Sequence, residues 1–573
     1  GIRDWSVTGV QTCALPIWIC KISGGKKAGR NKFLRFKDFD TRGKIKGVAI
    51  DTGGKRNLVV GVTSPLGSFI NKSIQLSSKT NLFWLSPGGI HLGAGAGFVN
   101  VPKLNLSTSR SLRFGEGTFD VFKTRASELT ALKGDPLPGS LGFGGIETLD
   151  ALAADGMVPV IQMDGIDIRM DRELFADAPG GVVEVRESTI HVGDGEVSAS
   201  RLTLTGEEVV VGEGTQLRAE QASGGGTIEV GGSWQNSDET VRQAKRTVVE
   251  AGALLDASAG DVGDGGEIVV WSDVTNPHSW TNVTGQLLAR GGSISGDGGR
   301  IETSGHALNL NGAVPDVGSL YGQGGEWLID PWNITIGSVD TNTSNSNGIV
   351  SASGSPASVS AFLIRSALGF GDVTIQTTGS GGDSGDIRVE NIVYAPERSG
   401  ALTLIADNDI TVVETGGFES FSGSGNLKLD AQGDIFVDGY INWDPGASGS
   451  VELKSAKGEI SGFDTGTLSV INGTLKLDVG TNAIAEPFEG EIVLSQGVVL
   501  EKDGPGEFVV GPIGENLNEI HDIYLNNGSL RLVNQDALSN YGSPYSGKIY
   551  FRGGGFTHGS ATDFSSNFSN EAN

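Results

Sequence analysis

The stretch Ala401-Leu402-Thr403-Leu404 recurs at regular intervals along the second half of the chain. Related stretches begin at Asn426, Ser450 and Thr474, so their first apolar residues lie 25, 24 and 24 residues apart. Apolar and polar residues alternate within each stretch, which predicts a strand that buries one face. Strands that recur at one repeat length predict a parallel β-helix with an inward apolar ladder. The predicted ladder consists of Leu402, Leu427, Val451 and Leu475.

A second apolar series follows the first at the same interval. Its members are Asp409-Ile410, Asp434-Ile435, Glu459-Ile460 and Ala483-Ile484, with steps of 25, 25 and 24 residues. A helical repeat is the competing interpretation, but the apolar period is 2, and glycine and β-branched residues fill the repeats. We therefore predict an all-β fold, a right-handed parallel β-helix.

Glycine-rich corners lead into short strands in the first half of the chain. Gly263-Asp264-Gly265-Gly266 runs directly into the alternating stretch 267–270, and similar units begin at Gly224, Gly296 and Gly322. A glycine pair allows positive φ and a tight bend. One such unit cannot bury its apolar face alone, whereas a stack of units can. These units therefore predict the same kind of solenoid.

The chain has 573 residues, which are too many for one ordinary globular core. Its charge is distributed unevenly. Residues 1–60 hold 13 Lys and Arg against 4 Asp and Glu, whereas the remainder holds 29 against 64. Phosphate repels so acidic a surface, so we expect no nucleic-acid partner. The chain has 90 glycines, about twice the usual share, and the excess lies in the repeats, where it marks corners.

The ends of the chain lack the patterns found elsewhere. Residues 1–17 show no period or cap and resemble translated sequencing-adapter read-through, so residues 1–30 are interpreted as an artefact or disordered lead. The chain begins without Met and is interpreted as an internal fragment. Both cysteines, Cys13 and Cys20, lie in this lead, so the rest needs no disulfide. The sequence contains no run of 18 apolar residues, so we predict no transmembrane helix.

Four regions follow the lead in our interpretation. Residues 31–150 contain strand pairs and a hairpin at Leu112–Phe119. Residues 337–399 are interpreted as a linker with one short helix, capped by Ser355 and ended by Gly369. The four regions are an N-terminal unit (31–150), a glycine-rich stalk (151–336), the linker (337–399) and the regular repeats (400–573).

The N-terminal unit resembles the secretion domain of two-partner-secreted exoproteins, the family of filamentous haemagglutinins and large haemolysins. That family shows a strand, then Asn-Pro-Asn-Gly-Ile, then a small-residue run and a hairpin. Here residues 81–85 match the strand, residues 92–96 the small-residue run and residues 112–117 the hairpin. The signature is occupied by Ser86, Pro87, Gly88, Gly89 and Ile90, so both of its asparagines are replaced.

Residues 256–331 are similar in order and spacing to the stalk of the same exoproteins. The similarity rests on Asp256-Ala257-Ser258, on the glycine units and on Trp327-Leu328-Ile329-Asp330-Pro331. The resemblance implies a secreted or cell-surface protein, exported through an outer-membrane β-barrel transporter that recognises the N-terminal domain.

Candidate chemical sites in the sequence are weak, and we expect no catalytic, cofactor or metal site. The six histidines, His91, His191, His278, His306, His521 and His558, show no metal-ligand spacing. The Gly-Asp-Gly-Gly units resemble calcium nonapeptide repeats but are not in tandem, which favours structural corners. Asp407 with Asp409, and Asp434 with Asp438, are the acidic pairs that a polysaccharide lyase or hydrolase would need.

Three functions remain open from the sequence. The first is an adhesin-type β-helical stalk that contacts a surface receptor or glycan. The second is a β-helical polysaccharide-active enzyme. The third is the carrier portion of a contact-dependent toxin.

Overall fold

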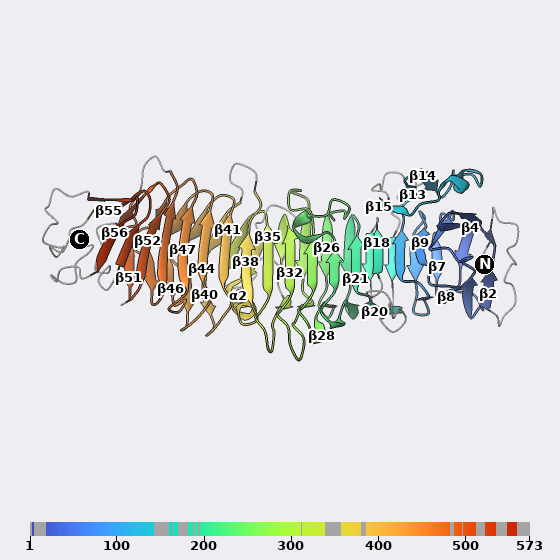
Figure 1. Ribbon diagram of the computed structural model, residues 1–573, viewed down its shortest axis with the longest axis horizontal. Helices are drawn as coiled ribbons and strands as arrows, with labels where there is room; N and C mark the ends of the chain where they lie inside the picture. Colours follow the sequence, from blue (N-terminus) through green and yellow to red (C-terminus); the bar gives the residue numbers. More distant parts are fainter. Residues whose placement is uncertain are drawn as a thin grey trace.

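The protein is a β-solenoid of about 16 turns in a computed structural model, and it forms one elongated rod (Figure 1). The structure describes residues 3–4, 19–141, 160–163, 166–169, 182–186, 189–192, 195–310, 312–337, 357–379, 385–481, 486–495, 497–510, 522–533 and 547–558. Strands make up 51% of it and helix 4%, which confirms the all-β prediction.

The first face of the solenoid is a row of parallel strands that runs from one end of the rod to the other. Each strand pairs with its counterpart in the next coil, as expected where one coil templates the next. The row consists of β4 (Asn31–Asp40), β6 (Asn57–Val62), β9 (Asn81–Leu85), β12 (Lys103–Ser107), β18 (Val182–Arg186), β21 (Arg201–Thr205), β25 (Thr227–Val230), β29 (Glu267–Trp271), β32 (Arg300–Gly305), β35 (Glu326–Pro331), β38 (Asp372–Gln376), β41 (Leu402–Ala406), β44 (Leu427–Ala431), β47 (Ser450–Ser455), β50 (Thr474–Val479), β52 (Val499–Asp503), β54 (Asp522–Leu525) and β56 (Lys548–Phe551).

The second face follows the first after a corner that we call the first corner. Its strands are β7 (Ser68–Ile70), β10 (Ile90–Leu92), β16 (Val160–Met163), β19 (Thr189–Val192), β22 (Glu208–Val211), β26 (Arg246–Val249), β30 (Trp280–Val283), β33 (Ala307–Asn309), β37 (Ala357–Ser360), β36 (Ile334–Gly337), β39 (Ile387–Val389), β42 (Ile410–Val412), β45 (Ile435–Val437) and β48 (Ile460–Ser461). In this row β37 pairs with β36, so the chain inserts a later strand before an earlier one.

The third face completes each coil with several shorter parallel sheets. Its strands are β2 (Ile19–Ile22), β5 (Gly47–Ile50), β8 (Ser73–Leu76), β11 (Gly97–Val99), β17 (Ile166–Arg169), β20 (Gly195–Ser198), β23 (Thr215–Arg218), β27 (Leu254–Asp256), β31 (Gln286–Leu288), β34 (Val314–Asp316), β40 (Ile392–Ala395), β43 (Gly417–Ser420), β46 (Tyr440–Trp443), β49 (Thr467–Val470), β51 (Glu491–Leu494), β53 (Glu507–Val510), β55 (Ser529–Leu532) and β57 (Gly555–His558). A two-stranded sheet, β24 (Gln221–Ser223) with β28 (Ala259–Val262), extends one corner.

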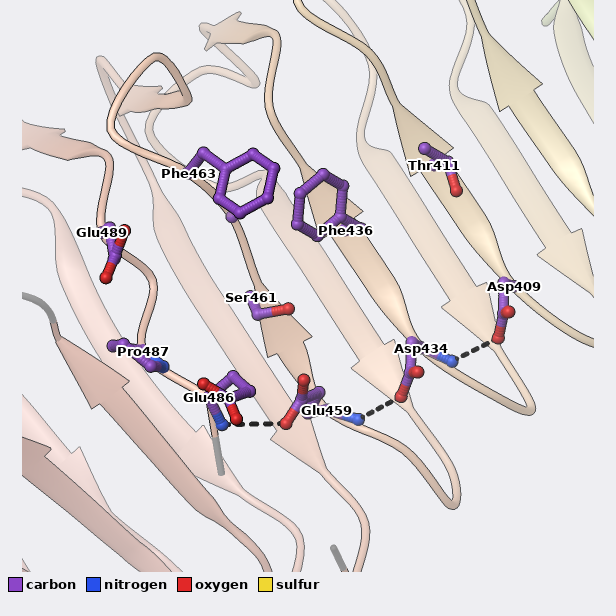
Figure 2. A pocket seen from close by; sticks show the side chains of 11 residues that line it. Asp409, Thr411, Asp434, Phe436, Glu459, Ser461, Phe463, Glu486, Pro487 and Glu489 are labelled. Carbon is purple, nitrogen blue, oxygen red and sulfur yellow. Dashed lines mark hydrogen bonds between the residues drawn. The ribbon is translucent and has the colours of Figure 1, made fainter. Parts of the chain in front are cut away.

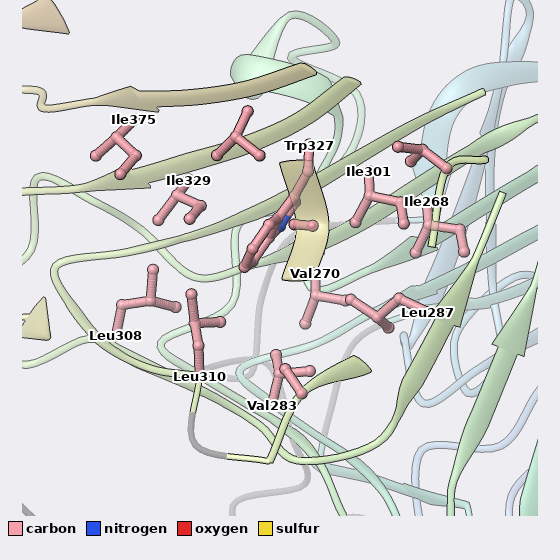
Figure 3. Close-up of a cluster of buried hydrophobic side chains, with 14 of the residues drawn as sticks. Ile268, Val270, Val283, Leu287, Ile301, Leu308, Leu310, Trp327, Ile329 and Ile375 are labelled. Atoms are coloured by element: carbon pink, nitrogen blue, oxygen red, sulfur yellow. The ribbon is translucent and has the colours of Figure 1, made fainter. Parts of the chain in front are cut away.

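The predicted ladder lies in the interior of the first face. Leu402 pairs with Leu427, Leu427 with Val451, and Val451 with Leu475, and all four side chains are buried. Further toward the N-terminus, Ile268, Ile301 and Trp327 occupy the same row (Figure 3). The Trp327 indole N–H donates to Thr303 Oγ1 at 3.2 Å, so the polar atom of this large core residue is satisfied.

Outward rows of the first face carry alternating charges in the regular repeats. Lys428 pairs with Glu452 at 3.6 Å and with Asp430 at 3.0 Å, and Lys454 pairs with Asp430 at 3.1 Å. Opposite charges therefore face each other in neighbouring coils, whereas a slip of two residues in the strand pairing would place Lys428 opposite Lys454, or Asp430 opposite Glu452. This alternation supports the same register as the interior ladder.

The glycine corners stack, but their glycines have two different roles. Gly224, Gly263 and Gly296 have positive φ, as the tight bend requires. The glycine pairs that follow do not. At Gly265 a Cβ atom would collide with the carbonyl oxygen of Ala289, and at Gly298 with that of Val317. Close approach between coils, and not positive φ, therefore explains the pairs.

The region predicted as a linker belongs mostly to the solenoid. Residues 357–379 and 385–399 contribute β37, β38, β39 and β40, and one continuous hydrophobic cluster extends from Cys20 to Leu532. The predicted helix exists as α2 (Ala361–Leu368) and ends at Gly369. Its N-cap is Ser360, whose Oγ accepts the N–H groups of Phe362 and Leu363, and not Ser355, which lies outside the described residues.

The N-terminal unit adds antiparallel elements to the first coils. The predicted hairpin is β13 (Ser111–Phe114) with β14 (Gly117–Asp120), joined by β15 (Pro136–Leu141) and by the 3₁₀ helix η1 (Glu128–Ala131). Phe114 and Phe119 of the hairpin pack on Phe33 and Phe83 of the first face. This second apolar cluster fixes the hairpin to the outside of the rod.

The first coil begins earlier than the sequence predicted. The strand β2 starts at Ile19, and β3 (Lys26–Ala28) pairs antiparallel with β4, as does the short β1 (Arg3–Asp4), so residues 19–30 are part of the fold and not of a disordered lead. Cys20 is buried and disulfide-bonded. No helix among the described residues is long and apolar enough to span a membrane.

Candidate functional site

The signature turn lies at the first corner, between β9 and β10. The N–H of Gly89 donates to the Ser86 carbonyl at 2.9 Å and closes the turn, and Gly89 has a φ of +113°. Ser86, Pro87, Gly89 and Ile90 are buried, and only Gly88 is partly exposed. The folded turn therefore presents little surface to another molecule.

The turn is held by close backbone contact with the preceding coil and by a buried hydrogen-bond network. A Cβ atom on Gly88 would collide with the Ser64 carbonyl oxygen in the preceding coil. Inside the corner, the Trp84 indole N–H donates to Ser68 Oγ at 3.0 Å, and Ser68 Oγ donates to Ser86 Oγ at 2.8 Å. Ser86 thus satisfies a buried network, which is a structural reason for a small hydroxyl residue at this position.

A row of carboxylates occupies the first corner of the regular repeats. Asp409, Asp434, Glu459 and Glu486 lie in successive coils and form a line (Figure 2). The backbone N–H of Asp434 donates to Asp409 Oδ1 at 2.7 Å, and that of Glu459 donates to Asp434 Oδ1 at 2.8 Å. Glu486 continues the pattern, since its N–H donates to Glu459 Oε2 at 2.9 Å. We call these four residues the acidic row.

Two phenylalanine rings lie beside the acidic row. Phe436 and Phe463 meet edge to face, with ring centroids 5.0 Å apart, and Phe463 is 57% exposed (Figure 2). The acidic row and the two rings line a groove of about 390 Å³. Among the described residues that line this groove there is no Lys or Arg, although Lys457 is exposed in the same corner as Glu459.

The electrostatics of the groove follow from this arrangement. Partial burial raises the pKa of Asp409, and the neighbouring carboxylates of Asp434 and Asp386 raise it further, while the Asp434 N–H opposes the shift. The groove can therefore attract cations and accept hydrogen bonds from hydroxyl groups, and its rings offer an apolar surface.

The acidic pairs expected from the sequence are arranged differently in the structure. Asp409 and Asp434, taken from two different pairs, meet in one groove. Asp407 instead accepts the N–H of Gly379 at 3.0 Å, and Asp438 accepts the hydroxyl of Thr465. Neither Asp407 nor Asp438 lines the groove. The stacking of aligned corners, which the 25-residue step already implies, is the signal that would have found the row.

The aspartates of the glycine units have the same capping role as the acidic row. Asp264 Oδ1 accepts the N–H of Asp297 at 2.8 Å, and Asp297 Oδ1 accepts the N–H of Gln323 at 2.7 Å. Across the described part of the chain, no group of three or more His, Cys, Asp and Glu side chains is placed to hold a metal ion. His306 stacks on Trp332, with ring centroids 5.2 Å apart, and His91 stacks on Phe69 at 4.7 Å.

Buried acids on the outer surface of the first face were not predicted. Glu302 and Asp330 lie in adjacent coils and are almost completely buried. Burial raises the pKa of Glu302 to about 8 and that of Asp330 to about 7. Their outward register does not suggest burial, because the segments that cover them lie elsewhere in the sequence.

No protein-family model matches this sequence, and a search of curated proteins finds no significant match.

Proposed function

We propose that the protein is an adhesin-type exoprotein whose β-solenoid acts as a stalk for adhesion or display. The single observation that supports this function is the continuity of the rod, about 16 turns with one unbroken interior cluster. A stack in which each coil contacts only its neighbours extends in one direction and separates its two ends.

We also propose that export uses an outer-membrane β-barrel transporter, which would recognise the N-terminal unit, and that the stalk meets a receptor or glycan on another surface. This route rests on the resemblance of residues 81–117 to secretion domains. The fold suits such a route, because a self-templating chain can cross a pore unfolded and then add coils to a folded N-terminal unit.

Export can be tested with the whole chain placed behind a signal peptide, in cells that hold a two-partner transporter. We expect the chain in the medium, and we expect deletion of residues 57–120 to leave it in the periplasm. A matched control deletes residues 402–450, which removes two coils and joins Ala401 to Val451 in register. Equal secretion of both deletions would contradict the proposal.

A second candidate function is contact with, or cleavage of, a neutral polysaccharide at the groove. The observation that favours it is the acidic row beside Phe436 and Phe463, since carboxylates serve as acid and base in glycan chemistry. The purified chain should show no lyase or hydrolase turnover if the stalk is purely structural. Turnover that is lost in Asp434→Asn, and retained in the Asp438→Asn control, would favour the enzyme instead.

A further inference from the structure

Residues 231–245, which we call the flap, leave the first face after β25 and return to the second face at β26. The flap is closed at its base, where the Ala244 N–H donates to the Gly231 carbonyl at 2.7 Å. Near its outer end, the Gln235 N–H donates to Glu302 Oε2 at 2.8 Å. Because β25 pairs with β29 and β29 with β32, this contact spans two coil-to-coil steps.

The flap covers an apolar strip on the outside of the rod. Val269, Trp271 and Val274 are buried there, and Trp234 of the flap and Trp332 pack against them. The Trp271 indole N–H donates to Gln243 Oε1 at 3.0 Å. The Arg300 guanidinium lies over the Trp234 ring, 4.2 Å from its centroid. The flap thus shields tryptophan surface that the coils alone would expose.

Glu302 lies beneath the flap and is 0% exposed. Apart from the Gln235 N–H, its carboxyl accepts the Ser304 hydroxyl at 2.9 Å. No ion pair within the described part of the chain includes Glu302.

The charged groups around Glu302 are engaged elsewhere or are acidic. On the first face, Glu267 pairs with Arg300, and Asp330 accepts the Thr378 hydroxyl. The remaining groups belong to the flap and to the segments packed with it. Asp238 accepts hydrogen bonds from Thr240, Glu239 is exposed, Arg242 and Lys245 pair with Glu207, Asp273 accepts the Thr275 hydroxyl, and His306 Nδ1 contacts the Val274 carbonyl.

We propose that the flap is a pH-sensitive latch, closed over β32 while Glu302 is protonated and released when Glu302 ionises. Closure removes the Glu302 carboxyl from water, whereas release returns it to solvent and uncovers the tryptophan strip. An ionised Glu302 beneath a closed flap would be a buried charge close to Asp330 and Glu267, and the like charges would oppose closure.

The direction of the effect follows from linkage. Burial raises the pKa of Glu302 in the closed state to about 8, whereas a solvated glutamate has a pKa of about 4.5. The stabilisation of the closed state is therefore complete below the lower value and is lost as the pH rises through the upper one. The ratio of open to closed flap should rise on the order of 10²-fold between pH 5 and pH 8.

Hydrogen exchange of the full chain, read by mass spectrometry and corrected for the intrinsic pH dependence of exchange, tests the latch. We expect the protection of residues 231–245 to fall on the order of 10²-fold between pH 5 and pH 8. The protection of β44, far along the rod, should stay constant. Glu302→Gln keeps the acceptor and removes the charge, so its flap should stay protected at both pH values.

Two further variants complete the test. Glu239→Gln changes an exposed acid of the same flap and should behave like the parent. Trp234→Ala weakens closure without touching Glu302, so its flap should open at a lower pH than in the parent. A parent flap equally protected at pH 5 and pH 8 overturns the latch. So does release of Glu302→Gln at the same pH as the parent.

Discussion

Lys502 occupies an interior position that both neighbouring coils fill with leucine. It pairs with Leu477 on one side and Leu525 on the other, and its side chain is 0% exposed. Its ammonium donates to the carbonyl oxygens of Asp503 and Gly504, the latter at 3.2 Å. Burial lowers the pKa of Lys502 to about 8, although the carboxylates of Asp478 and Asp503 oppose the shift.

Replacing this lysine should change how stability depends on pH. Because the folded chain lowers the pKa of Lys502, the unfolded chain binds more protons between pH 8 and 10.5, and the free energy of unfolding rises with pH. Lys502→Met removes this contribution, which amounts to up to about 3 kcal/mol. Urea unfolding at pH 7 and pH 10 measures the change, with the outward Lys476→Met as control. A difference between parent and variant that is the same at both pH values would contradict the prediction.

Leu427 tests the interior ladder more directly. Leu427→Asp places an unpaired charge among buried leucines and should lower the free energy of unfolding by about 4 kcal/mol or more. Thr403→Asp points outward in the preceding coil, next to Lys428, and should change it by less than about 0.5 kcal/mol. Similar losses for both variants would mean that the ladder does not face inward.

At the scale of elements, the glycine pairs decide how closely coils approach. Gly265→Ala would drive a Cβ atom into the Ala289 carbonyl, so we expect a loss of about 1–3 kcal/mol in thermal or urea unfolding. Gly115→Ala, in the turn between β13 and β14, is the control, because nothing lies within 4 Å of the added Cβ atom there. A Gly265→Ala protein as stable as the control would mean that the corners can separate without cost.

Alternation and repeat length predicted most of the strands, because burial of one face acts on every second residue. The pairing of Leu402 with Leu427 follows directly from the 25-residue step. The predicted start of α2 was wrong, because Ser360 caps the helix and the residues before it form β37. These residues are extended because they pair with β36, a contact that the local sequence does not reveal. Solenoid strands within the predicted linker were missed for the same reason.

At the scale of the whole molecule, the stack fixes a length. About 16 turns at ~4.8 Å per strand spacing give a rod of roughly 80 Å. Small-angle scattering of the monomer should show a pair-distance function with a long tail of at least that extent. Deletion of residues 402–450 should shorten the rod by about 10 Å, the rise of two coils. An unchanged length would show that the coils do not stack along one axis.

The candidate groove could be predicted only in part. The acidic residues were visible in the sequence, and the 25-residue step places Asp409 and Asp434 at the same corner of adjacent coils. Phe463 joins the groove from a turn whose course depends on packing against Phe436, and the alternation pattern contains no information about that contact. The cover over Glu302 was equally hidden, because residues 67 positions apart in sequence meet only through the stacking of coils.

The flap also has a mechanical consequence. When one end of a solenoid is pulled, each coil is held only by its neighbour, so coils peel away one at a time at low force. The bond from Gln235 to Glu302 ties β25 to β32, so the coils between them must yield together. A stalk under tension would therefore unravel coil by coil up to this point. While the flap is closed, a higher force would be needed to separate the coils beyond it.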